Sequence, residues 1–364
     1  MVTCKVCGSP KAAGTLGICG PCIRKNPQSA VRASFLAHQK SRYPFPPAPP
    51  RSPEGIICRT CANNCCLGPG EVGFCGLRAN REGRLVNFAG SSKRGLVTWY
   101  HDPLPTNCVA DWVCPAGSEG GYPEYSYAPG KEYGYNNLAV FFGGCSFDCL
   151  FCQNRSYHQM AKERRPLASP EELVNAILPR TACICFFGGD PSPQMVFALR
   201  ACKLALEKYP GKILRICWET NGNINPRYLR QMAEVSLKTG GCVKFDLKAW
   251  NEDLHQSLTG VSNRQTLANF AALADYCKER PEPPFLVAST LLVPGYVDSV
   301  EVEAIAKFIA GLNPDIPYSL LAFYPQHFLG DLPLTSKQEA LACREAALAA
   351  GLKRVRLGNI HLLQ

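Results

Sequence analysis

The chain has 364 residues, of which 46% are hydrophobic and 19% are charged, so it can bury a barrel-sized core with a smaller unit beside it. Its net charge of +10 fits acidic partners but also ordinary solubility. There are 21 cysteines, yet the first residues lack the apolar stretch of a signal peptide, and no apolar run approaches the roughly 18 residues of a membrane span. We therefore expect a cytoplasmic protein that does not enter a membrane and whose clustered cysteines bind metal rather than form disulfides.

Residues 1–25 contain two Cys-x-x-Cys pairs, Cys4 with Cys7 and Cys19 with Cys22. This spacing is typical of a small zinc ribbon, which is strong support for a metal and weak support for any particular function. Such a unit can bind a protein, a nucleic acid or neither.

Residues 26–55 are basic and then rich in proline, a composition that favours a semi-extended linker over a packed element. Residues 56–130 follow as a Cys-rich segment with many Gly and Pro, which we expect to form loops held by metal. Four of its cysteines form a second candidate site: Cys58, Cys61, Cys65 and Cys75. Four thiolates can close a zinc site or hold an iron–sulfur cluster, and the sequence does not decide between the two. Cys108 and Cys114 are weaker candidates in the same segment.

Residues 131–364 alternate short apolar runs with helical stretches, as buried parallel strands and their crossover helices do. The runs are Leu138–Phe142, Cys183–Phe187, Ile213–Trp218, Cys242–Leu247, Phe285–Val293, Tyr318–Phe323 and Val355–Leu357. Ser169 and Ser336, each with Glu three residues later, predict capped helix starts. About six strand–helix units are too few for a closed eight-fold barrel. We therefore predict an α/β fold with a partial, open parallel β/α barrel.

The strongest chemical signal is Cys145, Cys149 and Cys152, spaced C-x3-C-x2-C directly after the first predicted strand of this core. Thiolates are soft ligands suited to iron–sulfur clusters. A four-iron cubane needs four ligands and this motif supplies three, which leaves one iron open to a small molecule. The alternative is a structural zinc site with a fourth ligand elsewhere. Loops at the carboxyl ends of barrel strands are where α/β barrels place their chemistry, which favours the cluster.

The same motif, with Phe151 before the third cysteine, resembles the radical S-adenosylmethionine (SAM) superfamily. The likeness covers about residues 56–364. It is strongest to the activating enzymes of glycyl radical enzymes, such as pyruvate formate-lyase, and to the radical SAM protein of the AmmeMemoRadiSam system. It implies a 4Fe–4S cluster that binds SAM and cleaves it reductively to methionine and a 5′-deoxyadenosyl radical, which takes hydrogen from a substrate. It also implies an electron donor such as flavodoxin or ferredoxin, and a protein or peptide substrate.

Several shorter stretches carry this resemblance and imply site residues. Gly188-Gly189-Asp190-Pro191 stands where the superfamily has Gly-Gly-Glu-Pro, and Glu219-Thr220-Asn221-Gly222 resembles an activase Asp-Thr-Asn-Gly motif. The implied SAM contacts are Asn154, Gly188, Gly189, Asp190, Glu219, Asn221 and His327. Asp246-Leu247-Lys248 resembles an activase motif near the substrate's glycine loop, so Asp246 and Lys248 are the candidate catalytic pair. Since they lie two apart on a strand they share a face, and a plain ion pair is the alternative.

Hydrogen abstraction from a protein or peptide backbone is thus the first functional hypothesis. The second is a radical SAM enzyme that modifies RNA, based on the N-terminal ribbon and a basic segment interleaved with Phe35 and Tyr43, which could stack on bases. Its basic residues are Arg24, Lys25, Arg32, Lys40 and Arg42. The third hypothesis is a non-enzymatic scaffold with zinc in every cysteine cluster.

Overall fold

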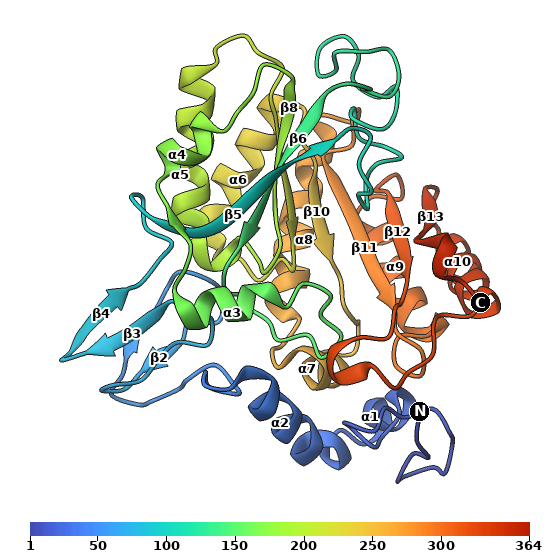
Figure 1. Ribbon diagram of the computed structural model, residues 1–364. Helices are drawn as coiled ribbons and strands as arrows, with labels where there is room; N and C mark the ends of the chain where they lie inside the picture. Colours follow the sequence, from blue (N-terminus) through green and yellow to red (C-terminus); the bar gives the residue numbers. More distant parts are fainter.

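The computed structural model describes residues 1–364 and is built around one nine-stranded sheet (Figure 1). Its strand order is β13-β12-β11-β10-β9-β8-β6-β5-β7. Seven strands are parallel: β6 (Asn136–Phe142), β8 (Thr181–Phe187), β9 (Arg215–Thr220), β10 (Val243–Asp246), β11 (Leu286–Leu292), β12 (Tyr318–Ala322) and β13 (Val355–Gly358). All seven apolar runs named from the sequence coincide with these strands. The sheet has two free edges, which confirms the predicted open barrel.

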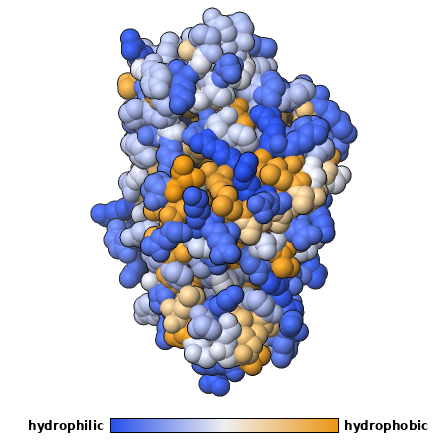
Figure 2. Space-filling model, turned by 90° about the vertical axis from the view of Figure 1, so that its right-hand side faces the viewer, coloured by the Kyte–Doolittle hydropathy of each residue, from blue (hydrophilic) through white to orange (hydrophobic).

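Two antiparallel strands that the sequence did not predict extend the β6 edge. These are β5 (Gly95–Pro103), which pairs with β6, and β7 (Leu167–Ala168), which pairs with β5. At the opposite edge β13 has no further partner. Figure 2 shows that side of the molecule, where hydrophilic residues surround a band of apolar ones. The exposed apolar side chains of the neighbouring helix α10 are Leu341 and Leu348.

Helices along the outer face of the sheet bury the main apolar core. They are α4 (Pro170–Asn175), α5 (Met195–Lys208), α6 (Pro226–Thr239), α8 (Arg264–Ala274), α9 (Ser299–Leu312) and α10 (Lys337–Ala349). The capping boxes predicted at Ser169 and Ser336 start α4 and α10. Short 3-10 turns cover Ser192–Gln194, Asp275–Lys278, His327–Leu329 and Ile360–Leu362. None of these helices is both long and apolar enough to cross a membrane.

The carboxyl ends of the parallel strands face the N-terminal part of the chain, drawn in blue below the sheet in Figure 1. The elements at this end are α1 (Gly20–Lys25), α2 (Gln28–Arg42), α3 (Ser156–Glu163) and α7 (Glu252–Thr259). Short strands flank them: β1 (Ile56–Ile57), β2 (Cys66–Leu67), β3 (Arg78–Arg81) and β4 (Arg84–Asn87). Both α1 and α2 contact α7. The first 90 residues therefore pack against the end of the barrel where its chemistry is expected.

The expected linker over residues 26–55 is corrected in part, because residues 28–42 form helix α2. One face of this helix is buried, and the buried residues are Ala30, Ser34, Ala37, His38, Ser41 and Arg42. They recur at helical spacing but are small or polar, so the sequence shows no apolar stripe to reveal the helix. The proline-rich residues 44–50 contain neither helix nor strand.

Candidate functional site

A cavity of about 240 Å³ opens at the carboxyl ends of the parallel strands. Its lining brings together residues that are far apart in sequence: Cys145, Phe147, Cys149, Phe151, Cys152, Gln153, Asn154, Tyr157, Phe187, Gly188, Gly189, Asp190, Glu219, Asn221, Asp246, Lys248, Leu291 and Leu321. Every candidate SAM or substrate residue named from the sequence is in this lining except His327. A larger cavity of about 340 Å³, around Pro281 and Ile316, lies at the opposite end of the strands and contains no thiol cluster.

Three thiols approach the cavity from the loop after β6, and no fourth cysteine or histidine lines it. Burial raises the pKa of all three, that of Cys149 to about 12 and that of Cys145 well above its usual range. Lys248 opposes the shift at Cys149, and the Asn221 Nδ2 group donates to Cys145 Sγ at 3.6 Å. Thiols in such a setting stay protonated unless a metal displaces the protons. The donor set therefore fits a cluster that is held by three thiolates and is open toward the cavity.

The Gly188–Gly189 turn at the end of β8 brings the backbone against the cavity. Both residues have positive φ, of 62° and 57°. A Cβ at Gly188 would lie 2.0 Å from Phe141 Cδ1, and one at Gly189 would lie 2.2 Å from the Phe142 carbonyl oxygen. No side chain fits at either position, so the turn requires glycine on two grounds.

Replacing Gly189 by alanine tests this requirement. The left-handed conformation and the clash should together cost about 2–5 kcal/mol in unfolding free energy. Gly211 is the matched control because its φ is +74° but no atom lies within 4 Å of its Cβ position. Gly211→Ala should cost only the conformational part, about 1–2 kcal/mol. Urea unfolding measures both variants, and equal losses would contradict the close approach at Gly189.

Asp190 is buried and ties the ends of two strands together. Its carboxylate accepts from Thr220 Oγ1 at 2.8 Å, from the Asn221 backbone N–H at 2.9 Å and from the Ser192 backbone N–H at 2.9 Å. Burial raises the pKa of Asp190, against these hydrogen bonds. The carboxylate thus holds the cavity wall in place, and the contact of Asp190 with SAM stays a prediction.

Two lysine–carboxylate pairs lie beside the cavity. Lys248 Nζ is 2.7 Å from Asp246 Oδ2, and Ser289 Oγ donates to Asp246 Oδ1 at 2.6 Å. Burial opposes the charge of Lys248, but the Asp246 carboxylate together with the nearby Cys149 and Cys152 outweighs this effect and raises the lysine pKa. Buried Lys244 lies 3.5 Å from Glu219 Oε2, and burial raises the pKa of Glu219. Asp246 and Lys248 do form an ion pair, and this pair also borders the cavity.

Asp148, for which the sequence analysis predicted no role, lies inside the cysteine motif and is completely buried. His38 Nδ1 is 2.8 Å from its Oδ2, Ser41 Oγ donates to its Oδ1 at 2.8 Å, and Arg155 Nη1 is 3.2 Å away. Burial alone would raise the pKa of Asp148, but the hydrogen bond from His38 and the charge of Arg42 outweigh it and lower the pKa to about 2. The N-terminal helix α2 therefore holds the loop that carries the three thiols.

His327 belongs to this network and not to the cavity lining. Its Nε2 lies 3.1 Å from Ser41 Oγ, and burial lowers its pKa to about 4. His327 follows β12 and has a positive φ of 53°, so the chain turns sharply at this residue. The sequence placed it after the correct strand but could not show this turn.

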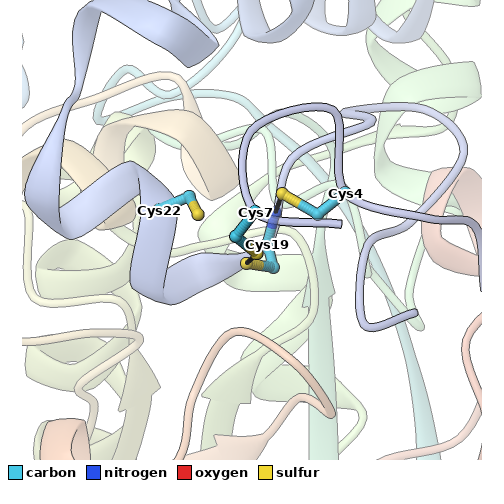
Figure 3. A group of neighbouring side chains, drawn as sticks. All are labelled: Cys4, Cys7, Cys19 and Cys22. Carbon is cyan, nitrogen blue, oxygen red and sulfur yellow. Dashed lines mark hydrogen bonds between the residues drawn. The ribbon is translucent and has the colours of Figure 1, made fainter. Parts of the chain in front are cut away.

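The first cysteine pairs form a compact group. The sulfurs of Cys4, Cys7, Cys19 and Cys22 all lie within 4.8 Å of one another (Figure 3). Cys7 Sγ and Cys19 Sγ are 3.7 Å apart. The group can hold a metal ion, and backbone contacts dock it on the core, among them Gly20 N–H to the Gly295 carbonyl oxygen at 2.8 Å.

Comparison with known proteins gives one matching family model, described as the radical SAM superfamily, over residues 139–309. An uncharacterized protein of Methanocaldococcus jannaschii is 24% identical over 84% of this chain and 81% of its own length. A second protein of that organism, named as a glycyl-radical enzyme activating enzyme, is 30% identical over 58% of this chain and 77% of its own length. The isethionate sulfite-lyase activating enzyme of Desulfovibrio desulfuricans is 33% identical over 39% of this chain, which spans only 44% of that enzyme.

Proposed function

The chain belongs to the radical SAM superfamily, and from that premise we propose that Cys145, Cys149 and Cys152 hold its 4Fe–4S cluster and that the adjoining cavity binds SAM. Membership of this superfamily makes the protein an enzyme and excludes the non-enzymatic scaffold. A cluster of this kind, when bound, supplies the electron that cleaves SAM.

One observation carries the proposal: the cavity has three thiols in its lining and no fourth soft ligand. A structural zinc site would need that fourth ligand within bonding distance. An open cluster instead needs free space beside the thiols, and the cavity supplies it. The zinc alternative for these three cysteines therefore lacks the fourth cysteine or histidine that structural zinc sites use.

The other residues of the lining have separate tasks in this proposal. The Gly188–Gly189 backbone and Asn221 border the place where the amino acid end of SAM would lie. Glu219 and Asn154 add hydrogen-bonding groups around it. Phe151, Leu291 and Leu321 give the cavity apolar walls, which keep water away from a reactive radical.

We assign substrate contact to Asp246 and Lys248, because this pair borders the cavity away from Gly189 on the strand β10 side. A protein or peptide is the proposed substrate class, supported by relatives that are named activating enzymes. A reduced flavodoxin or ferredoxin is the proposed electron donor.

The RNA alternative loses part of its basis in the structure. Of its five basic side chains, Arg24 is paired with Asp298 at 2.7 Å and Arg42 is buried beneath Phe74. Three basic side chains remain for a nucleic acid, together with the exposed Phe35 and Tyr43. This is a smaller charged surface than the sequence indicated.

Reductive SAM cleavage tests the proposal directly. Protein reconstituted with iron and sulfide under anaerobic conditions should form 5′-deoxyadenosine from SAM and dithionite, measured by liquid chromatography. Reactions without dithionite and reactions with air-oxidised protein are the controls and should form none. Protein that contains iron but leaves SAM intact would contradict the proposal.

A further inference from the structure

The cysteines of the second candidate site come from two separate segments, the β1–β2 loop and the turn before β3. Cys58 follows β1 and Cys65 precedes β2, and the Cys58 backbone N–H donates to the Cys65 carbonyl oxygen at 2.8 Å. Cys61 lies between them and Cys75 comes from the turn before β3. All four are 5–8% exposed, and none forms a disulfide. Phe74, the residue before Cys75, packs in the same apolar cluster as Cys58 and Cys65, so the two segments that carry the four thiols lie side by side.

Sulfur spacing distinguishes a single ion from a cluster. Tetrahedral zinc, with zinc–sulfur bonds of about 2.3 Å, places its four sulfurs only about 3.8 Å apart. The N-terminal group meets that requirement, because all its sulfurs lie within 4.8 Å of one another. Among Cys58, Cys61, Cys65 and Cys75, no three sulfurs all lie within 4.8 Å of one another. A cubane holds each thiolate on a different iron, so its sulfurs lie farther apart than around a single ion. The sulfurs of Cys145, Cys149 and Cys152 likewise do not all lie within 4.8 Å of one another.

The surroundings of these thiols suit an anionic cluster. The Arg51 guanidinium donates to the carbonyl oxygens of Asn63 at 2.8 Å and Asn64 at 3.1 Å, which places it over the Cys61–Cys65 loop. Four thiolates around a cluster leave net negative charge, which a nearby arginine stabilises.

The second group lies directly against the cysteine motif of the cavity. Cys58 and Cys65 share one apolar cluster with Phe74, Phe147 and Cys145. A Cβ at Gly144 would lie 3.0 Å from the Cys75 carbonyl oxygen, and its φ of +87° turns the loop toward Cys75. Asn63 Nδ2 also donates to the Ser146 carbonyl oxygen at 2.7 Å. The two cysteine groups are therefore neighbours joined by packing and a buried hydrogen bond.

We propose that Cys58, Cys61, Cys65 and Cys75 hold a second 4Fe–4S cluster, adjacent to the first and closed by four thiolates. Since every iron has a protein ligand, this cluster can gain and lose one electron but has no open iron for SAM. The N-terminal group, with its closer sulfurs, takes zinc. The presence of a first cluster beside this one rests on the proposed function. The assignment of iron and sulfide to Cys58, Cys61, Cys65 and Cys75 does not.

The test uses the full chain with Cys145, Cys149 and Cys152 all replaced by alanine, which leaves the second group intact. After anaerobic reconstitution it should keep about four irons, about four sulfides and one zinc per chain, half the iron of the unchanged protein. The matched control is Cys202→Ala, a buried thiol of α5 within the main core, which should keep all the iron. Zinc in place of iron and sulfide in the triple variant would overturn the proposal.

Electron paramagnetic resonance gives a second readout. The dithionite-reduced triple variant should show a one-electron cluster signal that does not change when SAM is added. The unchanged protein should show an additional component that shifts with SAM. A SAM-sensitive signal in the triple variant would overturn the closed coordination. If instead the triple variant and the unchanged protein hold the same four irons, the second cluster stands and the proposed function fails.

Discussion

Protein in which Cys145, Cys149 and Cys152 are all alanine is expected to form no 5′-deoxyadenosine above background, a loss of more than about 10³-fold. These thiols are the only cysteines that line the cavity, so no other side chain there can replace them as soft ligands. The remaining lining would still shape a pocket for SAM. Binding without cleavage is therefore the expected behaviour, and anaerobic incubation with SAM and dithionite, followed by chromatography, measures it.

Cys202→Ala is the control for this experiment, because it also removes a buried thiol but from helix α5. It should cleave SAM at nearly the rate of the unchanged protein. If the triple variant cleaves SAM at a tenth of that rate or more, the reactive cluster must be bound by another group of cysteines. The proposed function would then be wrong in its site.

The sequence predicted the open barrel and candidate site residues after its strands because both depend on local patterns. Parallel strands buried on both faces appear as continuous apolar runs such as Leu138–Phe142, and each run ends in a turn that carries a chemical group. Parallel strands align their carboxyl ends, so successive turns such as Gly188–Gly189 and Asn221–Gly222 meet without further information. The position of the cavity thus follows from the order of the motifs.

The parts that the sequence did not predict depend on contacts between distant residues. Strand β5 is antiparallel and pairs with β6 although Gly95–Pro103 shows no simple alternation of burial. Helix α2 buries polar side chains, and His38 is 110 positions from its partner Asp148. A buried ion pair between distant segments leaves no periodic pattern, so only the structure reveals it.

Asp148→Asn is expected to destabilise the protein by about 3–5 kcal/mol, because it removes the buried charge that pairs with Arg155 and accepts a hydrogen bond from His38. The pKa of Asp148, about 2, is below its ordinary 3.8, so the carboxylate stabilises the folded protein above pH 4. That stabilisation is lost as the pH falls toward 2. Urea unfolding at pH 7, under anaerobic conditions, measures the difference between the variant and the unchanged protein.

Asp275→Asn is the matched control, since Asp275 and Lys278 form an exposed ion pair at 3.1 Å on the surface. Such a pair contributes at most about 1 kcal/mol, so this variant should unfold almost like the unchanged protein.

Asp148 also lies between two of the thiols that line the cavity, and a loosened loop should hold less iron. If the Asp148→Asn variant keeps both the unfolding free energy and the iron content of the unchanged protein, then α2 does not position the cysteine loop. A loss of both, with Asp275→Asn unaffected, would make the N-terminal helix part of the machinery that presents the cluster.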